Sequence, residues 1–137
     1  MAGAPYNSVI NTDEGAVTVY EYDAIAGWLP YTALRPKLSG DDALFGYDID
    51  LDGDNVLIGA PGSEDMGGNV GRGVAYVYAF NPFTGGFAMS KLIESSSSQV
   101  DAFFGAAVGI KDDLLAVGAP YHDSDTGRRC SLDATPS

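Results

Sequence analysis

The residues with the clearest chemical potential are four carboxylates that alternate along one short stretch. They are Asp48, Asp50, Asp52 and Asp54. A DxDxDG pattern opens the calcium loop of EF-hands, but that loop closes with a glutamate at its twelfth position, where this sequence has Gly59. On an extended strand, side chains of one face lie about 6.6 Å apart, too far for neighbours to share one ion comfortably. We therefore expect a solvated acidic face, with calcium as the alternative interpretation.

Other reactive side chains lack the partners that catalysis or zinc binding requires. His122 is the only histidine and Cys130 the only cysteine, and neither has a nucleophile or a second ligand at a recognised spacing. Two acidic loop segments, 63–65 and 123–125, follow successive Gly-Ala-Pro strands. Acidic residues are common in loops, so we expect polar loop residues there, with a weak cation contact as the alternative. The sequence predicts no catalytic residue, and we expect that the protein is not an enzyme.

Five aromatic residues could stack on a sugar or on a partner's side chain. They are Tyr20, Tyr22, Trp28, Tyr76 and Tyr78. An aromatic ring offers a large apolar face, which suits a binding surface and a protein core equally. Because half of the side chains of each strand must pack between sheets, we expect most of these five in the core.

The elements that position these residues are revealed by an internal repeat. The stretch 45–61, FGYDIDLDGDNVLIGAP, returns at 104–120 as FGAAVGIKDDLLAVGAP, and the same 14 residues separate Phe from the Gly of Gly-Ala-Pro in both copies. A third Gly-Ala-Pro occupies residues 3–5. The apolar positions recur, whereas Asp48 and Asp50 become Ala107 and Gly109. The repeat therefore encodes packing rather than carboxylate chemistry. Its motif residues are Phe45, Gly46, Gly59, Ala60 and Pro61, then Phe104, Gly105, Gly118, Ala119 and Pro120.

The hydrophobic pattern predicts an all-β protein. Period-2 alternation predicts strands, which we place at 15–23, 28–38, 45–52, 56–60, 73–80 and 87–93. In the strand 45–52, Phe45, Tyr47, Ile49 and Leu51 would share one face and the aspartates the other. Pro30 and Pro36 place the strand 28–38 at a sheet edge or in irregular pairing.

Four antiparallel strands in roughly 58 residues correspond to a β-propeller blade. We expect about two blade-equivalents of an incomplete propeller within residues 1–122. They are a half blade at 1–38, a full blade at 43–93 and a half blade at 103–120, followed by a disordered tail at 123–137.

Taken together, the Phe-Gly pairs, the three Gly-Ala-Pro segments and the tyrosine strands VTVY and AYVY resemble FG-GAP repeats over nearly all of residues 1–122. These repeats are the blades of the integrin α-subunit β-propeller and of many microbial secreted or surface proteins. The resemblance implies a non-catalytic binding or adhesion module, extracellular or at the cell surface, with a protein or glycan ligand. The interval of 14 residues leaves no room for the calcium loop of many family members. The chain therefore resembles the calcium-free variant, and we expect no cofactor.

Composition narrows the partners further. The net charge is −12, with 19 acidic residues against seven Lys and Arg, which disfavours nucleic acid because phosphates require cations. No apolar run approaches the roughly 18 residues of a membrane span, and the N-terminus lacks the features of a signal peptide.

Two blade-equivalents cannot close a ring. We therefore expect a fragment of a larger protein with further repeats, with self-association or a truncated product that does not fold alone as alternatives. An alternative function is that of an accessory propeller segment of a larger secreted enzyme, whose catalytic domain lies outside this chain.

Overall fold

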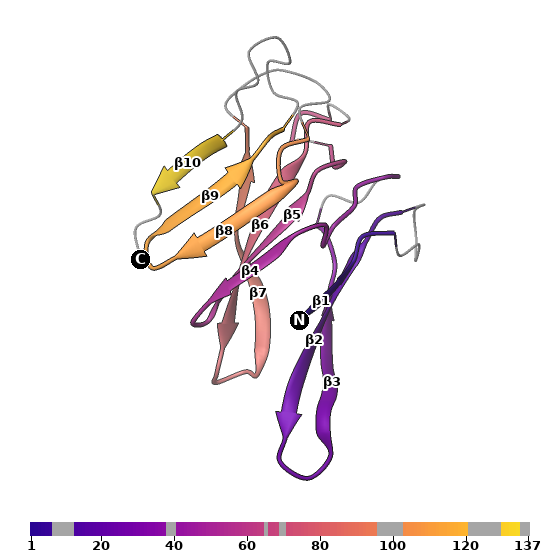
Figure 1. The fold of residues 1–137 in the computed structure, drawn as a ribbon, viewed down its shortest axis with the longest axis vertical. Coiled ribbons are helices and arrows are strands. Elements are labelled where there is room, and N and C mark those ends of the chain that lie inside the picture. The colour runs from indigo at the N-terminus through magenta and orange to yellow at the C-terminus, as the bar shows by residue number, and fades with distance from the viewer. Residues whose placement is uncertain are drawn as a thin grey trace.

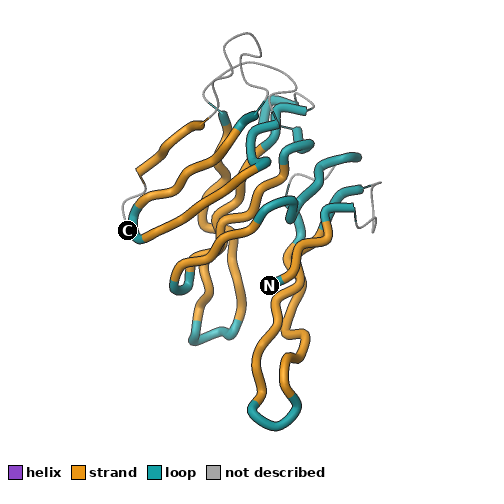
Figure 2. Tube along the Cα trace, viewed as in Figure 1, coloured by secondary structure: helices purple, strands orange, loops and turns teal. Residues whose placement is uncertain are grey.

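The computed structural model describes residues 1–6, 13–37, 41–64, 66–68, 71–95 and 103–120, together with the backbone of 130–134. In these residues every regular element is a β-strand, and the strands form three antiparallel sheets (Figures 1 and 2). The prediction of an all-β protein is therefore confirmed for the described part of the chain.

The N-terminal sheet has the order β1-β2-β3. Its strands are β1 (Ala2–Ala4), β2 (Ala16–Asp23) and β3 (Gly27–Leu34). Asp23 shapes the turn between β2 and β3, because its Oδ1 accepts hydrogen bonds from the amides of Ile25 and Ala26 at 2.8 Å each. These bonds lower the pKa of Asp23, and the bond from the Ala26 amide has the larger effect.

As predicted, β3 is an edge strand, and Pro30 lies beside an irregularity in its pairing with β2. An edge position tolerates proline because the missing amide has no ladder partner to lose. The strand ends at Leu34, however, rather than at residue 38.

The central sheet has the order β4-β5-β6-β7. Its strands are β4 (Ile49–Asp52), β5 (Asn55–Ala60), β6 (Val74–Asn81) and β7 (Gly86–Glu94). The predicted strand over 45–52 is shorter than expected, because the chain turns before Ile49. Leu44 and Gly46 have φ of 58° and 91°, which are left-handed values that an extended strand does not contain. The expected alternation is present within the strand. Ile49 packs against the cluster that contains Phe45, whereas Asp48 and Asp50 accept hydrogen bonds from the amides of Val108 and Ile110. Tyr47 precedes the strand and is half exposed.

The C-terminal sheet has the order β10-β9-β8. Its strands are β8 (Ala107–Lys111), β9 (Leu114–Gly118) and β10 (Cys130–Ala134). The last strand differs from the expected disordered tail, because Cys130–Ala134 pairs in antiparallel register along β9. Backbone pairing explains this difference: the free edge of a strand offers amides and carbonyls to any extended segment that reaches it.

The core lies on both faces of the central sheet. Toward the N-terminal sheet, one cluster contains Val17, Val19, Leu34, Phe45, Val56, Ile58, Ala60, Val74, Tyr76 and Tyr78. Toward the C-terminal sheet, the other contains Leu57, Ala75, Val77, Ile93, Phe104, Leu115, Val117 and Ala119. Alternate residues of β5 and β6 therefore point to opposite neighbours, and the central sheet is the middle layer of three.

Candidate functional site

The repeated glycines meet where two sheets join. A Cβ atom on Gly59 would overlap the carbonyl oxygen of Gly105, and one on Gly3 would overlap that of Gly46. Gly46 and Gly105 themselves have φ of 91° and 101°, values that L side chains rarely adopt. Gly3 and Gly59 thus each contact the Phe-Gly glycine of the next sheet, which accounts for the recurrence of both motifs at the two junctions.

The repeated phenylalanines fix the same two junctions. Phe45 donates its amide hydrogen to the carbonyl of Glu14 at 3.0 Å, and Phe104 donates to Arg72 at 3.0 Å. Both rings are fully buried, Phe45 in the cluster shared with the N-terminal sheet and Phe104 in the cluster shared with the C-terminal sheet. The motif residues are therefore structural, and they set the spacing of neighbouring sheets.

Three of the four aspartates bind the next sheet, in an arrangement that we call the aspartate ladder. Its hydrogen bonds run from Val108 N to Asp48 Oδ2 at 2.8 Å, from Ile110 N to Asp50 Oδ2 at 2.8 Å, and from Asp112 N to Asp52 Oδ2 at 2.5 Å. The expectation of a merely solvated face is wrong for these residues, because β8 lies against β4 and presents its edge amides to the carboxylates.

The same carboxylates also satisfy amides of their own strand. Oδ1 of Asp48 accepts from the Ile49 amide at 3.0 Å, and Oδ1 of Asp50 accepts from the Leu51 amide at 3.0 Å. Each of these two side chains therefore bridges the edge amides of β4 and β8. Covering an edge in this way removes donors that would otherwise be open to pairing with another chain.

The four aspartates do not gather into a metal site in the described residues. In the described ranges, no group of three or more His, Cys, Asp or Glu side chains is placed to hold a metal ion. Asp48, Asp50 and Asp52 direct oxygens at amides, and Asp54 lies apart from them, at the rim of a cavity described next.

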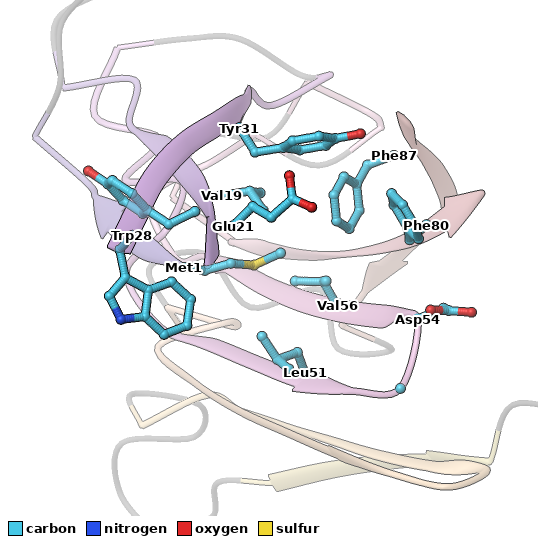
Figure 3. Close-up of a pocket in the computed structure, with 12 residues that line it drawn as sticks. Met1, Val19, Glu21, Trp28, Tyr31, Leu51, Asp54, Val56, Phe80 and Phe87 are labelled. Atoms are coloured by element: carbon cyan, nitrogen blue, oxygen red, sulfur yellow. The ribbon is translucent and has the colours of Figure 1, made fainter. Parts of the chain in front are cut away.

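A cavity of about 420 Å³, here called the inter-sheet hollow, opens between the N-terminal and central sheets (Figure 3). It lies at the end of the sheets that carries the turns after β2, β4 and β6. Residues from both sheets line it: Met1, Val19, Tyr20, Glu21, Trp28, Tyr31, Leu51, Gly53, Asp54, Val56, Phe80 and Phe87. The lining is mostly apolar and aromatic with few polar groups, which is the usual composition of a ligand pocket.

Backbone and side-chain bonds hold the walls of the hollow in place. The Tyr31 hydroxyl of β3 donates to the carbonyl of Gly85, in the turn between β6 and β7. The Phe80 amide donates to the carbonyl of Asp54 at 2.8 Å, which fixes the turn after β4. The rings of Phe80 and Phe87 pack together with centroids 5.1 Å apart. In Figure 3 the Glu21 carboxylate points between the Tyr31 and Phe87 rings.

The expectation of core aromatics is correct for one sheet and wrong for the other. Tyr76 and Tyr78 of β6 are buried. In the N-terminal sheet, by contrast, Tyr20, Tyr22 and Trp28 are 40%, 61% and 69% exposed. Tyr22 and Trp28 pack edge to face with centroids 5.2 Å apart. These exposed rings, two of which line the hollow, are candidate binding residues that the sequence alone does not separate from core residues.

The remaining candidates have no part in the hollow. Ser63 is buried and its hydroxyl donates to the carbonyl of Glu64 at 3.1 Å, so this loop serine has a structural contact. Asp65, His122 and the segment 123–125 lie outside the described residues, as does the side chain of Cys130.

The fold and junctions define a repeat protein made of stacked antiparallel β-sheets. Residues 38–78 match the family model of the FG-GAP repeat, so the chain contains an FG-GAP repeat over this segment. The match begins before β4 and continues into β6, so it includes the first copy of the Phe-Gly and Gly-Ala-Pro motifs. No curated protein gives a significant match to the chain. The described residues contain no helix long and apolar enough to cross a membrane.

Proposed function

We propose that this chain is a non-catalytic binding or adhesion module. Its three sheets would be blades of a β-propeller of the integrin-α-like type, in a secreted or cell-surface protein. In this proposal the half blade 1–38 would comprise the N-terminal sheet, the full blade 43–93 the central sheet, and the half blade 103–120 strands β8 and β9 of the C-terminal sheet. In support, the exposed aromatic residues Tyr20 and Trp28 line a cavity between two sheets.

The inter-sheet hollow is the observation that carries this proposal. Its volume of about 420 Å³ lies within the range of small-molecule and side-chain pockets. Exposed Trp28 and Tyr20 beside it supply rigid aromatic area, which is enriched where proteins bind ligands.

Intrinsic fluorescence tests the proposal, because Trp28 is the only tryptophan and lines the hollow. We expect a saturable change in its emission when the full chain is titrated with at least one member of a panel of short peptides and neutral oligosaccharides. Phe87→Ala, which removes a ring from the hollow, should abolish the response. Phe83→Ala should preserve it, because Phe83 is 97% exposed and is not part of the lining. Absence of a saturable response to every panel member would contradict the proposal.

A further inference from the structure

We propose that two hairpin tips of the chain insert into a zwitterionic lipid surface, such as a phosphatidylcholine bilayer. The tips are the turn between β2 and β3, residues 24–26, and the turn between β6 and β7, residues 82–85. Both turns lie at the same end of the sheets (Figure 1). The inference goes beyond the proposed function, because it concerns a surface outside the inter-sheet hollow.

The two turns are built in the same way, 58 residues apart. Asp23 ends β2 and Asn81 ends β6, and the side chain of each caps its turn. Oδ1 of Asp23 accepts a hydrogen bond from the Ile25 amide at 2.8 Å, and Oδ1 of Asn81 accepts one from the Phe83 amide at 2.9 Å. Such caps hold a turn in one conformation. Ile25 and Phe83 therefore occupy equivalent places at the apex of their hairpins.

The apolar side chain at each apex is almost fully exposed. Ile25 is 98% exposed and Phe83 is 97% exposed, whereas no other large apolar side chain of the described residues exceeds 69%. The recurrence of Phe45 and Phe104 is explained by their burial, but an exposed apex packs against nothing within the chain. Recurrence of an exposed apolar residue therefore indicates a contact outside the molecule.

An aromatic pair lies directly behind each apex. Tyr22 is opposite Trp28 in the register of β2 and β3, with ring centroids 5.2 Å apart, and Phe80 is opposite Phe87 in that of β6 and β7, at 5.1 Å. Tyr and Trp rings favour the depth of lipid headgroups, because one end of each ring system is apolar and the other is polar. An apolar apex followed by Tyr22 and Trp28 thus matches the order from acyl chains to headgroups.

The charge of the tips indicates the type of lipid. Segments 22–29 and 80–87 contain a single charged residue, Asp23, although the whole chain has 19 acidic residues and a net charge of −12. Neither segment contains a Lys or Arg that could bind an anionic headgroup. The net charge of the chain also repels an anionic membrane. A lipid surface without net charge therefore fits these tips better than an anionic one.

The two tips are joined to each other. The Tyr31 hydroxyl of β3 donates to the carbonyl of Gly85 in the turn between β6 and β7, so the hairpin that carries Ile25 is bonded to the turn that carries Phe83. One apolar side chain gives weak and reversible membrane binding, and a second insertion from the same molecule increases the overall affinity.

The test uses the full chain and vesicles of pure phosphatidylcholine. Trp28 is the reporter, because it is the only tryptophan and lies two residues beyond the first tip. We expect its emission to shift to shorter wavelength and to saturate with increasing lipid. Phosphatidylcholine with brominated acyl chains should quench the emission, whereas phosphocholine without acyl chains should leave it unchanged. Vesicles with about a third of phosphatidylserine should bind at least about threefold more weakly.

Matched variants locate the insertion, with vesicle flotation as a measurement that is independent of Trp28. Ile25→Ser and Phe83→Ser should each weaken partitioning by about threefold to tenfold, and the double variant should weaken it by more than either. Met66→Ser should leave partitioning unchanged. Met66 is 64% exposed and lies between β5 and β6, at the end of the central sheet opposite the tips. Circular dichroism of each variant should match that of the parent chain.

Several results would overturn the inference. If no vesicle changes Trp28 emission or floats the chain, the tips do not bind lipid, and the proposed function of the inter-sheet hollow is unaffected. Equal partitioning of the double variant, or tighter binding to vesicles with phosphatidylserine, would also contradict insertion of the tips. A response to phosphocholine alone would mean that a headgroup is bound without insertion. Self-association that the double variant abolishes, without lipid binding, would assign the tips to a protein contact instead.

Discussion

The two junctions between sheets share the Phe-Gly and Gly-Ala-Pro motifs and differ in the side chains that surround these motifs. At each junction a Gly-Ala-Pro glycine contacts a Phe-Gly glycine, and a buried phenylalanine packs beside them. Between the central and C-terminal sheets, the aspartate ladder then joins β4 to β8. Between the N-terminal and central sheets, the hairpin end opens into the inter-sheet hollow.

This difference separates the scaffold from the residues that give each junction its own character. Residues that recur, such as Phe45 and Phe104, supply packing that both junctions need. Residues that do not recur give each junction its own contacts: Asp50 accepts a hydrogen bond from the following sheet, whereas Glu21 lines the hollow. Four predictions test this division, in order of the effect that we expect.

The largest effect should follow loss of either repeated phenylalanine. Phe45→Ala and Phe104→Ala should each lower the free energy of unfolding by about 4 kcal/mol, because each removes a fully buried ring and leaves a cavity. Phe83→Ala is the matched control, since its ring is 97% exposed, and it should change stability little. Denaturant unfolding measures all three. A cost at only one of the two junctions would contradict the view that the motif supports both equally.

The repeated glycine should be the next most sensitive position. In Gly59→Ala the new methyl group would overlap the Gly105 carbonyl, and neither backbone can move away without separating the sheets. We expect a loss of about 3 kcal/mol in the free energy of unfolding. Gly86→Ala adds the same methyl group where the nearest atom is 3.7 Å away. If both variants melt at the same temperature, the close approach of the sheets has no energetic role.

A smaller effect should distinguish the bonded junction from the open one. Asp50→Ala removes the acceptor for the amides of Leu51 and Ile110, which should cost about 1–2 kcal/mol of stability. Asp54→Ala removes an equal charge from the adjoining turn without touching the ladder, and should cost less. Hydrogen exchange of the Ile110 amide provides a local measurement. It should accelerate in Asp50→Ala and not in Asp54→Ala.

The smallest effect at neutral pH concerns Tyr78, which reaches across the open junction. Burial, and then the neighbouring Tyr76, raise the pKa of Tyr78 to about 12, and its hydroxyl donates to the carbonyl of Arg35 at 2.7 Å. The unfolded chain releases this proton near pH 10 and the folded chain near pH 12. Tyr78 therefore contributes stability that is fully present below pH 10 and is lost as the pH rises to 12.

Denaturant unfolding between pH 9 and 12 measures this contribution. Tyr78→Phe should remove part of the alkaline loss of stability, whereas Tyr22→Phe, at a residue that is 61% exposed, should not. Identical alkaline profiles for the parent chain and Tyr78→Phe would show that the phenol at the open junction is not held in its protonated form.

The sequence predicts the contacts between sheets well, because residues that recur in both copies of the repeat are those that pack at both junctions. Phe45 and Gly59 have counterparts 59 residues later, and a buried contact that occurs twice leaves the same residue types twice. The start of β4 is harder to predict, because the left-handed φ of Leu44 interrupts an otherwise alternating pattern. Gly46 permits this turn, but leucine rarely adopts such a conformation, so the residue type at position 44 does not predict where the turn begins.

The ladder and the hollow could not be predicted, for two different physical reasons. The partners of Asp48 and Asp50 are backbone amides about 60 residues away, and every residue except proline has an amide, so no partner pattern exists to recognise. The hollow depends on how much of each tyrosine the neighbouring sheet covers, which residue type does not encode. Tyr20 and Tyr78 occupy equivalent places in the repeat, yet Tyr20 is 40% exposed and Tyr78 is buried.

The dependence of the aspartate ladder on backbone amides has a consequence for how such arrays can grow. The sheet that carries the aspartates supplies every side chain of the aspartate ladder, and the sheet that follows supplies only backbone amides. A duplicated or inserted unit with this acidic strand would therefore join any successor without compensating substitutions in it. Proline at positions equivalent to Val108, Ile110 or Asp112 would be the one incompatible residue, because it has no amide hydrogen to donate.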